Sequence, residues 1–133
     1  MIYKLKLLVL FLMLPAALFS QSKFEKKGDK ALLKGDYPEA IIQFKNIKNK
    51  NAEVNRKIAE CYFVLGNYDQ SENFYNSIQE KEKNSADLLH LSQINLANDN
   101  FTAAVLLAER AGELGADPNE VQIRLDAVRK FTE

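Results

Sequence analysis

The sequence has little reactive side-chain chemistry, because its 133 residues include one cysteine, one histidine and no tryptophan. A small protein built on disulfides would have several cysteines, so this chain must be stabilised by packing. HExxH, CxxC and GxSxG motifs and a glycine-rich phosphate loop are also absent from it. These absences argue against metal, nucleotide and hydrolase sites, and we expect no cofactor and no metal ion.

One long apolar run stands at the start of the chain. Lys4 and Lys6 precede an unbroken apolar stretch over residues 7–19, and small and polar residues follow it. This order is typical of a secretory signal peptide, and the run is shorter than the roughly twenty residues of a membrane span. We therefore expect residues 1–20 to be a signal peptide cleaved near Ser20. An uncleaved membrane anchor is the alternative.

Charged side chains are unevenly distributed along the rest of the chain. Residues 21–57 contain ten basic and five acidic side chains, whereas residues 58–133 contain six basic and thirteen acidic ones. Net charges of +5 and −7 follow, and such polarity can steer partners or favour head-to-tail self-association. Acidic residues interrupt the basic stretch, so nucleic acid binding is not indicated.

One pattern occurs three times, about thirty residues apart. The stretches KGDYPEAIIQF, LGNYDQSENFY and NDNFTAAVLLA begin at Lys34, Leu65 and Asn98. Each joins a polar or glycine turn to an aromatic residue and then to a small residue three positions later. Around these turns apolar residues recur at spacings of three and four, which predicts amphipathic helices. The period is typical of a repeated helix pair, and no stretch alternates long enough to predict a strand.

Helix start signals agree with this division. Asp36 with Glu39, and Asn67 with Gln70, have the form of a capping box. Further predicted N-caps are Asn51, Ser85, Asn100 and Asp117, the last of them followed by Pro118. The chain is therefore predicted to form six helices in three pairs and one final helix.

The pattern resembles the tetratricopeptide repeat, a unit of about 34 residues that forms two antiparallel helices. Small residues that let the helix backbones approach match Gly28, Ala59, Ser92, Ala40, Ser71 and Ala104. Aromatic positions match Tyr37, Tyr68, Phe101, Phe44 and Tyr75. The chain departs from the family pattern because it has no tryptophan, no proline between repeats before Pro118, and Ala108 at the third of the later aromatic positions.

The resemblance implies an all-α fold, a right-handed α-solenoid of three helix hairpins over about residues 21–50, 51–83 and 84–117. A capping helix over residues 118–133 would cover the third hairpin. The apolar residues expected to pack there are Val121, Ile123, Leu125, Val128 and Phe131. Those expected to face water are Arg124, Asp126, Arg129 and Lys130.

In the family that the chain resembles, the first helices line a concave groove that binds segments of other proteins. The residues that the resemblance places on this groove are Glu25, Asp29, Leu32, Leu33, Glu53, Arg56, Glu60, Phe63, Val64, Leu89, Gln93 and Leu96. Members that clamp a carboxylate carry lysine, asparagine and arginine on this surface. Because Glu25, Asp29 and Glu60 stand there instead, a partner segment with basic and apolar residues fits better.

Together these features predict a non-enzymatic adaptor of the bacterial periplasm or cell envelope that binds a peptide or helical segment of a protein. It would be a monomer or weakly self-associating, and would contact a membrane only through an uncleaved signal or an envelope partner. Alternatives are binding on the convex face, the N-terminal repeat segment of a larger outer-membrane or peptidoglycan-associated assembly protein, and a self-assembling scaffold. The most distant alternative is an enzyme with Cys61 and His90 as a nucleophile pair.

Overall fold

The computed structural model describes residues 23–133, and every regular element in this part of the chain is helical. The all-α fold predicted from the sequence is therefore confirmed. The predicted signal peptide, residues 1–20, lies outside the described residues. The chain forms two compact units, one that ends at Lys50 and one from Asn51 to Glu133, and each is described by itself.

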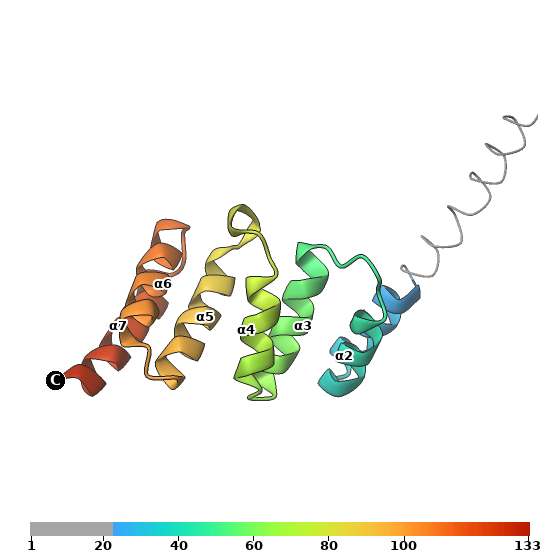
Figure 1. Ribbon diagram of the computed structural model, residues 1–133, viewed down its shortest axis with the longest axis horizontal. Coiled ribbons are helices and arrows are strands. Elements are labelled where there is room, and N and C mark those ends of the chain that lie inside the picture. Colours follow the sequence, from blue (N-terminus) through green and yellow to red (C-terminus); the bar gives the residue numbers. More distant parts are fainter. Residues whose placement is uncertain (1–22) are drawn as a thin grey trace, which may run out of the picture. The chain divides into compact units, whose positions relative to one another are not determined.

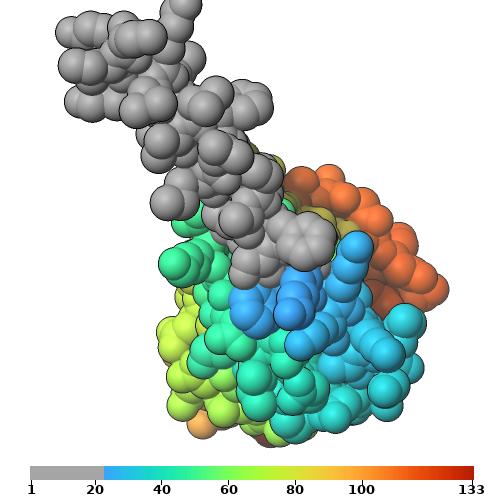
Figure 2. Space-filling model, turned by 90° about the vertical axis from the view of Figure 1, so that its right-hand side faces the viewer, coloured from blue at the N-terminus to red at the C-terminus, as the bar shows by residue number. Residues whose placement is uncertain are grey.

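The first unit is a helix pair. A helix over residues 23–33 is followed by a tight turn and by α2 (Tyr37–Lys45). Gly35 in the turn has a φ of 70°, a left-handed conformation that glycine adopts at no steric cost. A Cβ atom on Gly28 would lie 2.4 Å from Cε1 of Phe44, so the predicted close approach of the two helices is confirmed. In Figure 2 this unit, coloured blue to green, faces the viewer.

The second unit contains two further helix pairs and a last helix. Its elements are α3 (Ala52–Val64), α4 (Tyr68–Asn76), a short 3₁₀ helix η1 (Glu80–Glu82), α5 (Ser85–Ala97), α6 (Phe101–Glu113) and α7 (Pro118–Thr132). The main contacts join α3 to α4, α5 to α6 and α6 to α7, with smaller contacts from α5 to α4 and to α7 (Figure 1). This is the order of pairs and final helix that the sequence predicts.

Small side chains lie where the helices of a pair cross. In the second unit Ala59, Ser71, Ser92 and Ala104 are at most 1% exposed. The hydroxyl of Ser71 donates to the carbonyl oxygen of Ala59 at 2.8 Å, and that of Ser92 to the carbonyl oxygen of Ala104 at 2.6 Å. Serine is therefore small enough for the crossing and also links the two helices by a buried hydrogen bond.

One hydrophobic core extends through the second unit. Its buried members are Ala59, Tyr75, Ile78, Leu88, Leu89, Leu91, Ile94 and Ala111. Val121 of α7 packs against this core, so α7 covers its end as predicted. Ile123 is 60% exposed, and its predicted packing is wrong because residues two apart on a helix point in nearly opposite directions. Phe131 is also mostly exposed and stacks on Phe101, with ring centroids 5.9 Å apart.

Most of the predicted N-caps are confirmed. The side chains that accept a hydrogen bond from the first turn of a helix are those of Asp36, Asn51, Asn67 and Asp117. The prediction of Ser85 is wrong, because Asn84 caps α5 and forms a full capping box with Asp87. Asn84 has an acidic residue three positions later, whereas Ser85 has Leu88, which cannot return a hydrogen bond. Asn100 makes no side-chain cap bond.

Among residues 23–133, no helix is both long enough and apolar enough to cross a bilayer.

Candidate functional site

The predicted groove residues are divided between the two units. Glu25, Asp29 and Leu33 lie on the helix over residues 23–33 of the first unit, the first two partly buried and Leu33 exposed. The second unit holds Glu53, Arg56, Glu60 and Phe63 on α3, and Leu89 and Gln93 on α5. The candidate site lies within the second unit, where α3, α5 and α7 bring several polar and aromatic side chains together.

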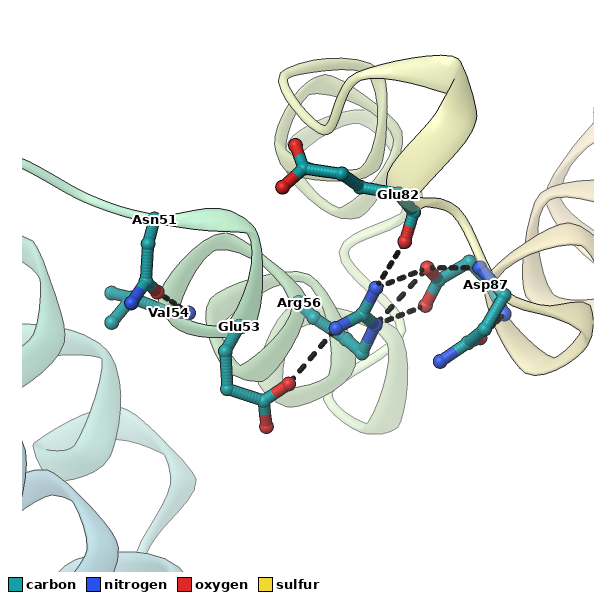
Figure 3. A network of polar contacts seen from close by, with 7 residues as sticks. Asn51, Glu53, Val54, Arg56, Glu82 and Asp87 are labelled. Carbon is teal, nitrogen blue, oxygen red and sulfur yellow. Dashed lines mark hydrogen bonds and ion pairs between the residues drawn. The ribbon is translucent and has the colours of Figure 1, made fainter.

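Arg56 of α3 forms the centre of a polar network with the start of α5 (Figure 3). Its Nε donates to both carboxylate oxygens of Asp87, at 2.8 and 3.0 Å, and a terminal nitrogen donates to the same carboxylate at 2.9 Å. The other contacts of Arg56 are to a carboxylate oxygen of Glu53 and to the carbonyl oxygen of Glu82, each at 2.9 Å. Hydrogen bonding to Asp87 raises the pKa of the Arg56 guanidinium. Arg56 thus links two successive repeats.

Asp87, the ion-pair partner of Arg56, was not predicted from the sequence. It is fully buried, and it also accepts a hydrogen bond from the backbone N–H of Asn84 at 3.1 Å. A buried carboxylate needs a charged partner, and Arg56 lies 31 positions earlier, one repeat length in this chain. A basic residue and an acidic residue separated by one repeat are therefore the sequence signal that could have identified the pair.

Glu60 lies on α3, one turn after Arg56, and is partly buried. Burial raises the pKa of its carboxyl group, and the negative charges of Asp87 and Glu53 raise it further, against the smaller lowering by Arg56 and Lys57. The carboxyl group therefore holds its proton to a higher pH than an exposed glutamate does. Glu60 lies three positions before Phe63, so the two side chains lie on the same face of α3.

An aromatic cluster surrounds the only histidine of the sequence. The rings of Phe63 and His90 stack with centroids 4.3 Å apart, and the ring centroid of Tyr68 lies 5.4 Å from that of Phe63. The buried hydroxyl of Tyr75 lies 2.5 Å from Nδ1 of His90. Burial lowers the pKa of His90, and the charge of Arg124 lowers it further, while Asp87 and Glu120 act in the opposite direction. His90 is therefore neutral near pH 7.

A pocket of about 420 Å³ lies between α5 and α7. Its lining residues are Ala86, Leu89, His90, Glu120, Ile123 and Arg124. Leu89 is buried and belongs to the core, so it forms part of the pocket floor. The expectation that Arg124 faces water is wrong, because this side chain is partly buried and its Nε has no hydrogen-bond partner among the described residues. Arg124 follows Val121 by three positions, which brings it onto the packed face of α7.

Cys61 and His90 were the candidate nucleophile pair. Cys61 is fully buried, and burial raises the pKa of its thiol to about 11. A thiol with this pKa is almost entirely protonated near pH 7, which disfavours nucleophilic attack. Within residues 23–133, no group of three or more histidine, cysteine or acidic residues is arranged to hold a metal ion.

Antiparallel helix pairs with small residues at their crossings define a class, the α-helical repeat proteins. Residues 31–94 match the family model of the tetratricopeptide repeat, which supports a protein of the tetratricopeptide repeat family. No curated protein matches the sequence. Repeats of this family generally mediate interactions between proteins, so the face formed by α3, α5 and α7 is a candidate surface for a protein partner.

Proposed function

We propose that the chain is a non-enzymatic adaptor that holds a segment of a partner protein on the face of α3, α5 and α7. One observation carries this proposal: Phe63 of α3 stacks on His90 of α5, and His90 lines a pocket together with Arg124 of α7. Two successive repeats and the last helix thus contribute partly buried polar and aromatic side chains to this face. Such side chains are common at the centres of protein interfaces.

The chemistry of this face indicates the kind of partner. Glu60 supplies negative charge about one turn before Phe63, and Glu53 adds negative charge in the first turn of α3. Val64 and Ile123 are exposed apolar side chains. A segment with basic and apolar residues complements this part of the surface. The buried Cys61, with its raised thiol pKa, supports an interaction role over a catalytic one.

The composition of residues 1–20 supports export, and we place the adaptor in the periplasm or cell envelope. A repeat segment of a larger envelope protein is compatible with the same surface. An alkaline phosphatase fusion joined after Ser20 tests export directly. Enzyme activity of the fusion in intact cells is expected, and activity only after lysis would contradict the proposed location.

Site-specific photo-crosslinking tests the binding face. A photoreactive amino acid is placed at Gln93, which lies on the face-forming helix α5, and in a matched control at Leu106, which is 60% exposed on α6. We expect the variant at position 93 to crosslink one partner protein in cells, and Glu60→Lys to abolish that product. Crosslinks from position 106 alone would assign binding to the other face. A self-crosslink lost at high salt would instead support a self-assembling scaffold, which the uneven charge distribution favours.

A further inference from the structure

The pocket between α5 and α7 contains a positive charge that packing does not explain. Arg124 is partly buried, and it forms neither a hydrogen bond nor an ion pair within residues 23–133, where its Nε is buried without a partner. Burying the Nε N–H of a guanidinium without a hydrogen-bond partner is unfavourable. Glu120, one turn earlier and exposed, lines the same pocket without forming an ion pair with Arg124. The pocket thus presents an arginine whose partner is missing from the described chain.

His90 adds a second hydrogen-bond donor to the pocket wall. The hydroxyl of Tyr75 is fully buried, and its proton needs an acceptor, which Nδ1 of His90 supplies at 2.5 Å. When Tyr75 donates to Nδ1, a neutral imidazole carries its proton on Nε2. Burial is the main cause that lowers the pKa of the imidazole and favours its neutral form; Arg124 lowers the pKa further, against the opposite effect of Asp87 and Glu120. His90 therefore has an N–H group that its contact with Tyr75 leaves available.

We propose that this pocket binds the carboxylate side chain of an aspartate or glutamate in the partner segment, with Arg124 and His90 as donors. A guanidinium matches the planar carboxylate and binds it more strongly than it binds a neutral group. Leu89 and Ile123 offer apolar walls for the methylene groups of the incoming side chain. The volume of about 420 Å³ lies within the range of roughly 300–1,000 Å³ that is common for small binding sites.

The inference rests on the proposed function and makes it more specific. On one face, Glu53 and Glu60 of α3 favour a basic residue of the partner, whereas Arg124 and His90 favour an acidic one. A segment with the two charges in the right order binds favourably at both places. A segment with the reverse order meets like charges twice, so the arrangement selects sequence and direction as well as net charge.

Because the chain has one histidine, the imidazole signals of His90 report on this pocket without overlap. Purified protein is titrated with the capped pentapeptide Ala-Leu-Glu-Leu-Ala, and the ¹⁵N and ¹H signals of the ring are followed by NMR. Matched peptides carry glutamine or lysine at the centre. We expect a saturable shift of the Nε2–H signal with the glutamate peptide, and at least about tenfold weaker binding of the glutamine and lysine peptides.

Two protein variants give opposite expectations. Arg124→Gln should weaken binding of the glutamate peptide at least about tenfold. Glu120→Gln removes a competing carboxylate from the pocket and should strengthen binding about twofold to fivefold. Urea unfolding of both variants shows whether they remain folded, and Arg124→Lys gives a second test because it keeps the charge and should retain part of the affinity.

Three results would overturn the carboxylate assignment. The first is equal binding of the glutamate and glutamine peptides. The second is that the lysine peptide binds and that Glu120→Gln weakens this binding. The third is that inorganic phosphate shifts the Nε2–H signal as much as the glutamate peptide does, which would make the pocket a general anion site. The photo-crosslink from position 93 separates this failure from that of the proposed function. If the crosslink persists and the peptide test fails, the face binds a partner through other chemistry.

Discussion

At the scale of single residues, the close approach of two helices depends on the side chain that is missing at Gly28. A Cβ atom there would lie 2.4 Å from the ring of Phe44, which is fully buried and cannot move aside. Alanine is favoured over glycine in a helix by about 1 kcal/mol, but overpacking of a core costs about 1–3 kcal/mol. We expect Gly28→Ala to lower the free energy of unfolding by about 1 kcal/mol, measured by urea denaturation.

Gly112 provides the matched control for this prediction. It also lies in a helix, α6, but an added Cβ would lie 3.5 Å from the nearest atom, a side-chain carbon of Val121, which is ordinary contact. Gly112→Ala should therefore raise the free energy of unfolding by about 0.5–1 kcal/mol. If both variants change stability in the same direction, helix propensity rather than the Phe44 contact determines the effect at Gly28.

The hydrogen bond between Tyr75 and His90 can be removed without opening a large cavity. Tyr75→Phe deletes one hydroxyl and leaves Nδ1 of His90 without the partner that it has at 2.5 Å. We expect a loss of stability of about 1–2 kcal/mol, because a partly buried acceptor is left unpaired. The NMR signals of His90 should change from one tautomer to a mixture. An unchanged tautomer would show that another group fixes the ring and would remove the stated reason for the Nε2–H donor.

At the scale of elements, the start of α5 shows where sequence patterns are sufficient and where they are not. A cap followed three positions later by an acidic residue is a local signal, and Asn84 with Asp87 has it. The same carboxylate also accepts hydrogen bonds from Arg56 of α3, and this contact depends on how two repeats stack. The helix was therefore predictable from local chemistry, whereas the burial of Asp87 and the engagement of Arg56 were not.

Removing one member of this buried pair should be costly. The side chain of Asp87 is fully buried and that of Arg56 is 13% exposed, so Arg56→Met leaves an uncompensated carboxylate. We expect a loss of about 3–5 kcal/mol in urea unfolding, which the further change Asp87→Asn should partly restore. Glu53→Gln removes only the exposed partner of Arg56 and should cost less than about 1 kcal/mol. Equal losses for Arg56→Met and Glu53→Gln would mean that the buried contact is not the important one.

The last helix illustrates the same limit. Periodicity identified α7 and its cap Asp117, and Val121 and Val128 are packed or buried as expected. Periodicity alone could not show that the helix leaves a pocket beside α5, because that depends on the tilt of one helix against another. Ile123, which was predicted to pack, is therefore exposed, and Arg124, which was predicted to face water, is partly buried. A partly buried arginine that forms no ion pair among the described residues is visible only once the helices are placed.

At the scale of the whole molecule, the repeat period determined most of the predictable architecture. Three copies of one turn and helix pattern predict helix pairs, since each unit buries its apolar face against its neighbours. The binding surface was predictable only as a set of positions on the first helices. Which of those side chains are committed to the fold, as Arg56 and Leu89 are, depends on packing between repeats.

The pH dependence of stability should show two opposing contributions from the same face. The pKa of His90 is lowered below its ordinary value of 6.5, so the unfolded chain binds the proton more tightly. Stability from this residue is therefore lost as the pH falls below 6.5. The pKa of Glu60 is raised above 4.5, so its contribution is full below that pH and is lost as the pH rises through 4.5 toward the folded-state pKa.

Two substitutions separate these contributions. Near neutral pH, Glu60→Gln should be more stable than the native protein, and the difference should vanish below pH 4.5, where the glutamate is protonated in both states. His90→Gln should show a smaller loss of stability than the native protein as the pH falls below 6.5. Urea unfolding across this range measures both, with the exposed change Glu113→Gln on α6 as the control. If Glu60→Gln has the same effect at every pH, desolvation of its charge does not act on folding. The acidic part of the binding face would then be more hydrated than its burial implies.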